Sequence, residues 1–180
     1  MRPTARRTVY LPRMSDHALA VAAAMRCQGI DAQALPAPDE ASLAAGLALC
    51  RGTECLPCFL CAGDFLRKCR EPGFDPRRAV FFMPTGPGPC RFGQYRVLQR
   101  AILEDQGFGG VEIVSPTTDD SYALFGDDPV RLRKLSWQAI VAVDLLTRVL
   151  HEHRDAFTSL APVPLVPTER GGVFANAFPA

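Results

Sequence analysis

Apolar and polar residues follow one another along the chain in blocks that predict strands alternating with helices. Short, β-prone apolar runs predict strands at 8–11, 31–35, 78–83 and 111–114. Apolar residues at helical spacing, with start and stop signals, predict helices at 15–29, 38–50, 57–70, 92–107 and 129–154. This order predicts an α/β fold: a three-layer, Rossmann-like domain with a mostly parallel sheet.

Signals at the ends of the predicted helices fix their limits. We expect Ser15 to be the N-cap of the first helix and Gly29 to lie just past its end. The second helix is expected to be capped near Asp39, and Asp128 with Pro129 is expected to open the last one. These signals place a single Rossmann-like domain at residues 1–160. The Pro- and Gly-rich segment 161–180 shows no periodicity and predicts an extended tail.

The last predicted helix carries more apolar residues than one packed face needs. We expect one stripe to pack on the sheet, formed by Leu135, Ala139, Ala142, Leu146 and Leu150. Ile140, Val141 and Leu145 would then leave apolar surface that suits a homodimer or a neighbouring chain.

Charge and hydropathy exclude several classes of protein. The chain of 180 residues has 20 basic and 19 acidic side chains, a formal net charge of +1 that indicates neither nucleic acid nor an anionic membrane as a partner. The apolar run after the basic start is too short for a signal peptide, and Asp144 and Arg148 interrupt the most apolar helix. We therefore expect a soluble, cytoplasmic protein.

The seven cysteines are the main chemical signal, because clustered thiols in a reducing compartment favour metal or redox chemistry. Ligand sites in parallel α/β folds lie at the carboxyl ends of the strands. Cys90 follows the third strand through a loop of alternating Pro and Gly, 84–89, which specifies an unusual loop shape. Cys55 and Cys58 begin the third helix and can reach the same edge. The others are expected to serve packing: Cys27, Cys50, Cys61 and Cys69.

Four kinds of chemistry compete for these residues. A dinucleotide cradle is disfavoured, because Arg91 stands where the third glycine of its motif belongs. Cys90 and Arg96 have the C-x5-R spacing of cysteine phosphatases, with Asp127 or Asp128 as a candidate general acid.

Metal binding accounts for the remaining two kinds of chemistry. Cys55 and Cys58 form half of a structural zinc site. An iron–sulfur cluster would use Cys55 and Cys90 with Cys58 or Cys61.

Four segments of the chain carry a family resemblance: "YLPRMSDHALAVAAAMRCQGIDAQALPAPDE", "RGTECLPCFLCAGDFLRK", "FFMPTGPGPCRFGQYRVLQRAILEDQGF" and "WQAIVAVDLL". Together they cover most of residues 10–146, and "GPCRFGQY" is the most specific part. In these segments the sequence resembles the large acyl-CoA dehydratase activase proteins, in the region related to 2-hydroxyacyl-CoA dehydratase subunits.

The resemblance implies an electron-transfer component that holds a 4Fe-4S cluster or a double cubane. It implies Cys55 and Cys90 as ligands, with Cys58 as a further one. His17 follows the first strand and is expected beside them, and Arg91 is expected to offset the negative charge of the cluster or to face a partner. Relatives have two α/β halves and often a fused ATPase, whereas this chain has a single half of that architecture and no ATPase signature. The expected partners are therefore an ATP-dependent activator protein or a second dehydratase-like subunit.

Overall fold

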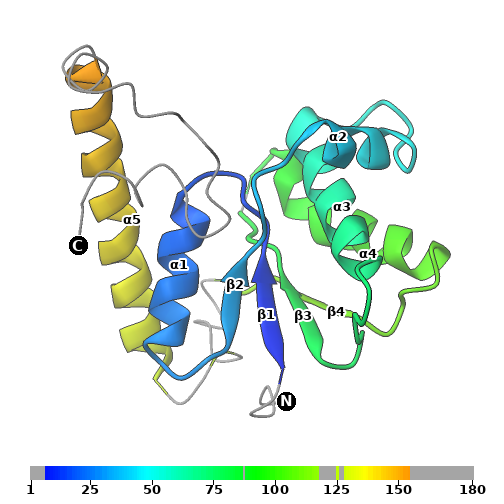
Figure 1. The fold of residues 1–180 in the computed structure, drawn as a ribbon, viewed down its shortest axis with the longest axis horizontal. Helices are drawn as coiled ribbons and strands as arrows, with labels where there is room; N and C mark the ends of the chain where they lie inside the picture. The colour runs from blue at the N-terminus through cyan, green and yellow to red at the C-terminus, as the bar shows by residue number, and fades with distance from the viewer. Residues whose placement is uncertain (1–6, 87, 118–124, 126–127, 155–180) are drawn as a thin grey trace.

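A four-stranded sheet with strand order β2-β1-β3-β4, in which every pairing is parallel, forms the centre of the computed structural model (Figure 1). The structure describes residues 7–86, 88–117, 125 and 128–154, so the predicted tail at 161–180 lies outside the described residues, as do 155–160 of the predicted domain. The strands are β1 (Thr8–Leu11), β2 (Ala32–Ala34), β3 (Ala79–Phe82) and β4 (Glu112–Val114). The α-helices are α1 (His17–Arg26), α2 (Glu40–Leu47), α3 (Leu56–Cys69), α4 (Tyr95–Asp105) and α5 (Pro129–Glu152), and a 3-10 helix, η1 (Arg91–Gln94), precedes α4. The predicted α/β class and parallel sheet are confirmed.

The strand order has a topological switch point between β1 and β3, because successive connections lead to opposite sides of β1. The chain moves from β1 to β2 through α1, then crosses back through α2 and α3 to reach β3 on the other side of β1. Loops that leave β1 and β3 therefore diverge at the carboxyl edge of the sheet, where ligands bind in folds of this type.

Helices cover both faces of the sheet, with α1 and α5 on one side and α2, α3 and α4 on the other (Figure 1). Alternate residues of β3 serve the two sides, as the pleat of a strand requires. Val80 and Phe82 belong to the core under α1 and α5, whereas Phe81 belongs to the core under α3 and α4. The ring of Phe81 stacks on that of Phe65 in α3, with centroids 4.2 Å apart. This stacking fixes α3 over the centre of the sheet.

Helices α2 and α3 approach each other so closely that their backbones touch at two glycines. A Cβ atom at Gly63 would overlap the carbonyl oxygen of Ser42, and one at Gly46 would overlap that of Phe59. Glycine is needed at both positions because of this approach, although it is a poor helix former.

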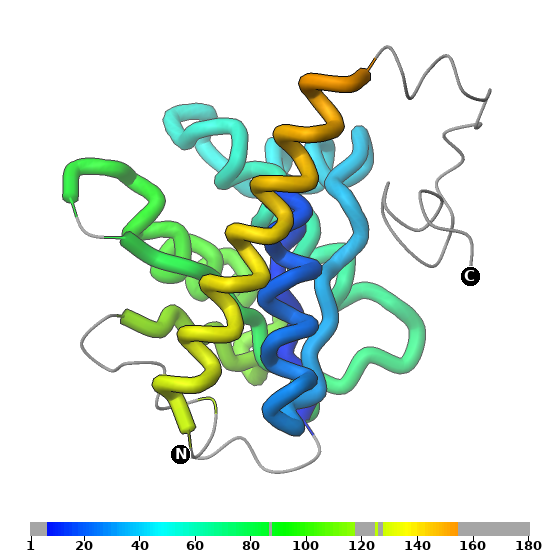
Figure 2. The backbone as a smooth tube through the Cα atoms, turned by 90° about the vertical axis from the view of Figure 1, so that its left-hand side faces the viewer, coloured from blue at the N-terminus to red at the C-terminus, as the bar shows by residue number. Residues whose placement is uncertain are grey.

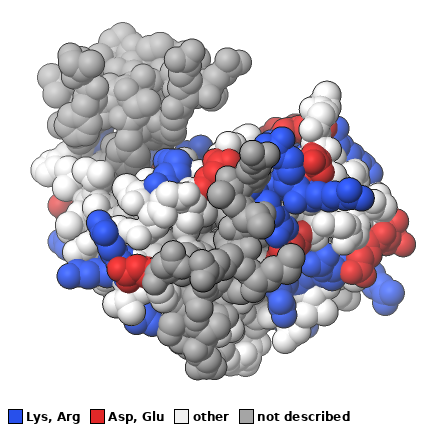
Figure 3. Space-filling model, turned by 90° about the horizontal axis from the view of Figure 1, so that it is seen from below, with Lys and Arg blue, Asp and Glu red and all other residues white. Residues whose placement is uncertain are grey.

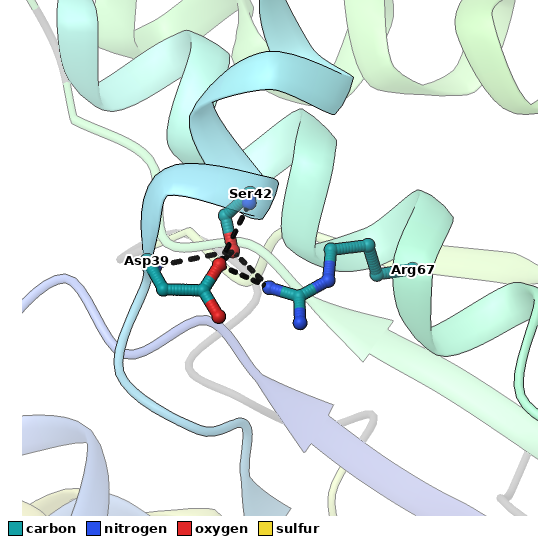
Figure 4. A network of polar contacts seen from close by, with 3 residues as sticks. All are labelled: Asp39, Ser42 and Arg67. Atoms are coloured by element: carbon teal, nitrogen blue, oxygen red, sulfur yellow. Dashed lines mark hydrogen bonds and ion pairs between the residues drawn. The ribbon is translucent and has the colours of Figure 1, made fainter.

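A polar network holds the start of α2 against α3 (Figure 4). Asp39 is the N-cap of α2, as predicted, and its Oδ1 accepts a hydrogen bond from the backbone N–H of Ser42 at 2.8 Å. Nη1 of Arg67 in α3 donates to Asp39 Oδ1 at 2.5 Å and to Ser42 Oγ at 2.6 Å. The bond from the Ser42 N–H is the largest of the effects that lower the pKa of Asp39, and Arg67 adds to them.

Two details of the first helix differ from the prediction. Helix α1 begins at His17 with Asp16 at the N-cap, so Ser15 is not the cap, and its hydroxyl contacts His17 Nδ1 instead at 2.8 Å. Cys27, expected in the core, is exposed, because it is the C-cap residue of α1, where the chain turns toward Gly29.

The packing of α5 also differs from the prediction. Leu132 is the residue of α5 that is buried, whereas Ala142 and Leu146, expected against the sheet, are exposed. A helix of 24 residues is about 36 Å long, but a four-residue strand spans only about 13 Å. Most of α5 therefore extends past the sheet and lies across α1 (Figure 2).

Gly63→Ala is expected to lower the free energy of unfolding by about 2 kcal/mol, because the new methyl group must push α2 away from α3. The sign is diagnostic, since the same change in an uncrowded helix stabilises by about 1 kcal/mol. Gly110→Ala is the matched control: its Cβ would lie 3.6 Å from Cβ of Pro76, an ordinary contact. Urea unfolding of both variants measures the difference. A Gly63→Ala protein as stable as the parent would contradict the close approach.

Candidate functional site

The loop after β3 folds back on itself and presents Cys90 at the surface. It starts from a fixed point, since Met83 N–H donates to the Val114 carbonyl at 2.8 Å and Ser115 Oγ donates to the Met83 carbonyl at 2.6 Å. A Cβ at Gly93 would lie 3.0 Å from the carbonyl oxygen of Gly86, so the two ends of the loop nearly touch. Cys90 is the exposed N-cap of η1. The Pro and Gly residues thus shape a tight loop that carries one thiol.

A second exposed thiol comes from the loop between α2 and α3. Cys55 is the N-cap residue of α3, and the helix continues through Pro57 in its first turn. The guanidinium of Arg91, next to Cys90, donates from Nη1 to the carbonyl oxygen of Thr53 at 2.5 Å. This bond joins the Cys90 loop to the Cys55 loop. Cys55 is the N-cap residue of α3, and Cys90 is the N-cap residue of η1.

Tyr95 links the Cys55 loop to α4. Its hydroxyl forms a hydrogen bond with Sγ of Cys55, and the tyrosine is only 4% exposed. Burial raises the pKa of Tyr95, and the bond to Cys55 raises it further, so the hydroxyl keeps its proton and can donate it to the sulfur. The ring of Phe92 packs edge-on against Tyr95, with centroids 5.3 Å apart. The pattern of residues along the chain did not predict this contact, although a buried tyrosine hydroxyl usually has a polar partner.

The three cysteines within α3 itself are buried: Cys58, Cys61 and Cys69. Cys58 is 1% exposed and packs in the core with Phe65 and Phe81. Burial raises the pKa of the Cys58, Cys61 and Cys69 thiols to about 12. The burial expected of Cys61 and Cys69 is confirmed, whereas Cys50 is half-buried, with its pKa raised by burial and by Glu54.

The exposed pair is suited to metal binding, but it is not a complete site. Among the described residues, no group of three or more Cys, His, Asp or Glu side chains is arranged to hold a metal ion. Cys55 and Cys90 have exposed side chains. Cys58 lies one turn into α3 and faces the core, so it would reach the same centre only if that turn opened.

His17 lies with α1, on the other side of the sheet from α3 (Figure 1). Both of its ring nitrogens have partners: Nδ1 contacts Ser15 Oγ, and Nε2 is 2.7 Å from Asp144 Oδ1 in α5. His17 therefore joins α1 to α5, and these contacts do not bring it to the exposed thiols.

The segment from Cys90 to Arg96 is not shaped like a phosphate-binding loop. The N–H of Gly93 donates to the Cys90 carbonyl at 3.3 Å and that of Tyr95 to Phe92, because the segment forms a 3-10 turn. These amides are thus unavailable to a phosphate. Asp128 caps α5 by accepting from the Arg131 N–H at 2.9 Å, and Asp127 lies outside the described residues.

Native alkylation should sort the cysteines by burial. The buried thiols of α3, whose pKa is raised to about 12, are ionised to only about one part in 10⁴ at pH 8. Cys27, Cys55 and Cys90 should therefore react with N-ethylmaleimide long before the buried thiols of α3. Peptide mass spectrometry after a timed pulse of reagent measures the order in which the cysteines are alkylated. Unfolding in guanidinium should abolish the difference between exposed and buried cysteines. Rapid native labelling of Cys58 would contradict its burial.

Comparison of the chain with protein-family models, with curated proteins and with solved structures gave no match. Among the described residues, no helix has both the length and the apolar content of a membrane span. The chemistry of the site therefore rests on its own residues. These are two exposed thiols at helix N-termini, on loops that Arg91 ties together.

Proposed function

We propose that this chain is an iron–sulfur cluster-binding, electron-accepting component of a 2-hydroxyacyl-CoA dehydratase or reductase system. The observation that carries the proposal is the pair of exposed thiols, Cys55 and Cys90, on two loops joined by the bond from Arg91 to Thr53. Thiolates are the usual ligands of such clusters, and hydrogen bonds to sulfur adjust their reduction potential. The buried Tyr95 hydroxyl at the Cys55 sulfur supplies a bond of that kind.

The proposed ligand set is Cys55 and Cys90, with Cys58 joining when the first turn of α3 opens. When bound, the group would accept and release single electrons near the carboxyl edge of the sheet. Arg91 offsets the negative charge that the thiolate ligands bring to the cluster. It also holds the two loops together through its bond to Thr53. His17 has no part in this site, because its two nitrogens are used between α1 and α5.

An incomplete ligand set favours an assembly, in which an ATP-dependent activator or a second dehydratase-like subunit covers the exposed thiols. The resemblance of "GPCRFGQY" and "ECLPC" to dehydratase-related proteins supports the same assignment, as one half of such an architecture working in the cytoplasm. The face seen in Figure 3, at the opposite edge of the sheet, has Lys and Arg side chains interspersed with Asp and Glu. Such a mixed surface does not favour an extended anionic partner there.

The same experiments also distinguish the iron–sulfur site from two other functions, a cysteine phosphatase and a structural zinc site. A cysteine phosphatase would use Cys90 and Arg96, but two of the amides between them, those of Gly93 and Tyr95, are bonded within the 3-10 turn. A structural zinc site would use Cys55 and Cys58, but the second of these faces the core. The exposed thiol pair therefore supports the iron–sulfur site better than either alternative.

Anaerobic reconstitution with iron and sulfide should give a brown, oxygen-sensitive protein. Cys55→Ser and Cys90→Ser should each lose most of the bound iron and sulfide, because each removes one of the two exposed thiolates of the site. Cys27→Ser is the matched control, since Cys27 is also exposed but lies at the end of α1. Iron and acid-labile sulfide analysis with visible absorption measures the loss.

Three results would contradict the proposal. They are stoichiometric zinc in place of iron, no iron and sulfide after anaerobic reconstitution, and a cluster that survives in Cys90→Ser but not in Cys27→Ser. Hydrolysis of an aryl phosphate that disappears in both Cys90→Ser and Arg96→Ala would favour the phosphatase instead.

A further inference from the structure

The outer surface of α5 carries a continuous apolar stripe that the fold does not use. Trp137, Val141, Leu145 and Val149 follow one another at intervals of four residues, which places them along one side of the helix. Trp137 is 66% exposed and Leu145 59%, and the other two are also exposed. Figure 2 looks onto this side of the molecule: α5 lies in front of α1, and no other described segment crosses it.

The opposite side of α5 already provides the contacts that hold the helix in place. Leu132 is buried in the core under α1, and Leu135 packs against the same core. His17 in α1 adds a polar contact to Asp144. A row of one aromatic and three aliphatic side chains left outside such a helix is typical of an interaction site in a folded protein.

We propose that this stripe binds the same stripe of a second copy of the chain, with the two α5 helices antiparallel about a two-fold axis near Val143. The stripe is symmetric about that residue. Val141 and Leu145 lie two residues before and after Val143, and Trp137 and Val149 lie six residues before and after it. An antiparallel pair thus sets Val141 against Leu145 of the second copy and the large Trp137 against the small Val149. The surface complements itself, as a two-fold dimer requires.

The charges beside the stripe fit the same register. Lys134 and Glu152 lie nine residues before and after Val143, so the antiparallel pair sets each lysine against the glutamate of the other copy. Arg148 holds Glu152 on the exposed surface of α5, with Nε 2.7 Å from its Oε1. A parallel pair would instead set each of these charges against its own kind, which is unfavourable. Charge therefore selects the antiparallel dimer.

The dimer leaves the thiol site open. Helix α5 covers one face of the sheet with α1, whereas Cys55 begins α3 and Cys90 leads into α4 on the other face (Figure 1). Each copy in the pair can therefore present its own thiols to another molecule. This dimer does not depend on the proposed iron–sulfur function, and either can fail without the other.

Sedimentation equilibrium of the full chain tests the dimer, and the parent protein is expected to be dimeric at micromolar concentration. Val141→Arg and Leu145→Arg should each weaken the dimer by roughly 100-fold, because a guanidinium would be buried at the centre of the contact. Val97→Arg is the matched control, an exposed valine on α4 that should change nothing. Circular dichroism of each variant verifies that α5 still folds.

A charge exchange tests the register. Lys134→Glu and Glu152→Lys should each weaken the dimer, and the double variant should recover most of the affinity, since both cross-dimer pairs are then restored with reversed sign. A monomeric parent protein, or a dimer that neither Val141→Arg nor Leu145→Arg weakens, would overturn the proposal. A double variant whose dimer is as weak as the dimers of the two single variants would overturn the antiparallel register.

Discussion

The hydrogen bond from Arg91 to the carbonyl oxygen of Thr53 is the contact on which the candidate site depends. It spans 38 residues of sequence and joins the loop after β3 to the loop before α3. The bond between the Tyr95 hydroxyl and the Cys55 sulfur adds a second link, from the start of α4. These two bonds hold together the loops that carry the two exposed thiols.

The elements behind these loops are closely packed, which matters because a ligand site on loops is only as well ordered as its supports. Phe65 stacks on Phe81 and holds α3 to the sheet, and Gly63 lets α2 press against the other side of α3. Tyr95 extends from α4 to the Cys55 sulfur, so the position of this thiol is set from two helices. The same packing that stabilises the fold therefore fixes where the thiols stand.

Much of this arrangement could be predicted from the sequence, because it depends on local patterns. The strands and helices follow from apolar periodicity and from caps such as Asp39 and Gly29, and the parallel sheet follows from their alternation. The exposure of Cys27, the partners of His17 and the bond between Tyr95 and Cys55 could not be predicted, since each depends on how distant segments meet. The position of α5 escaped prediction for a geometrical reason: its length exceeds that of the sheet it was expected to cover.

In the proposed cluster site, Cys55 and Cys90 act together on one bound group. The most direct test compares the alkylation of individual cysteines in protein with and without an anaerobically loaded iron–sulfur cluster, read by peptide mass spectrometry. Cys55 and Cys90 should lose their reactivity together on loading, while the exposed Cys27 should keep its own. A loaded protein in which Cys90 remains as reactive as Cys27 would contradict it.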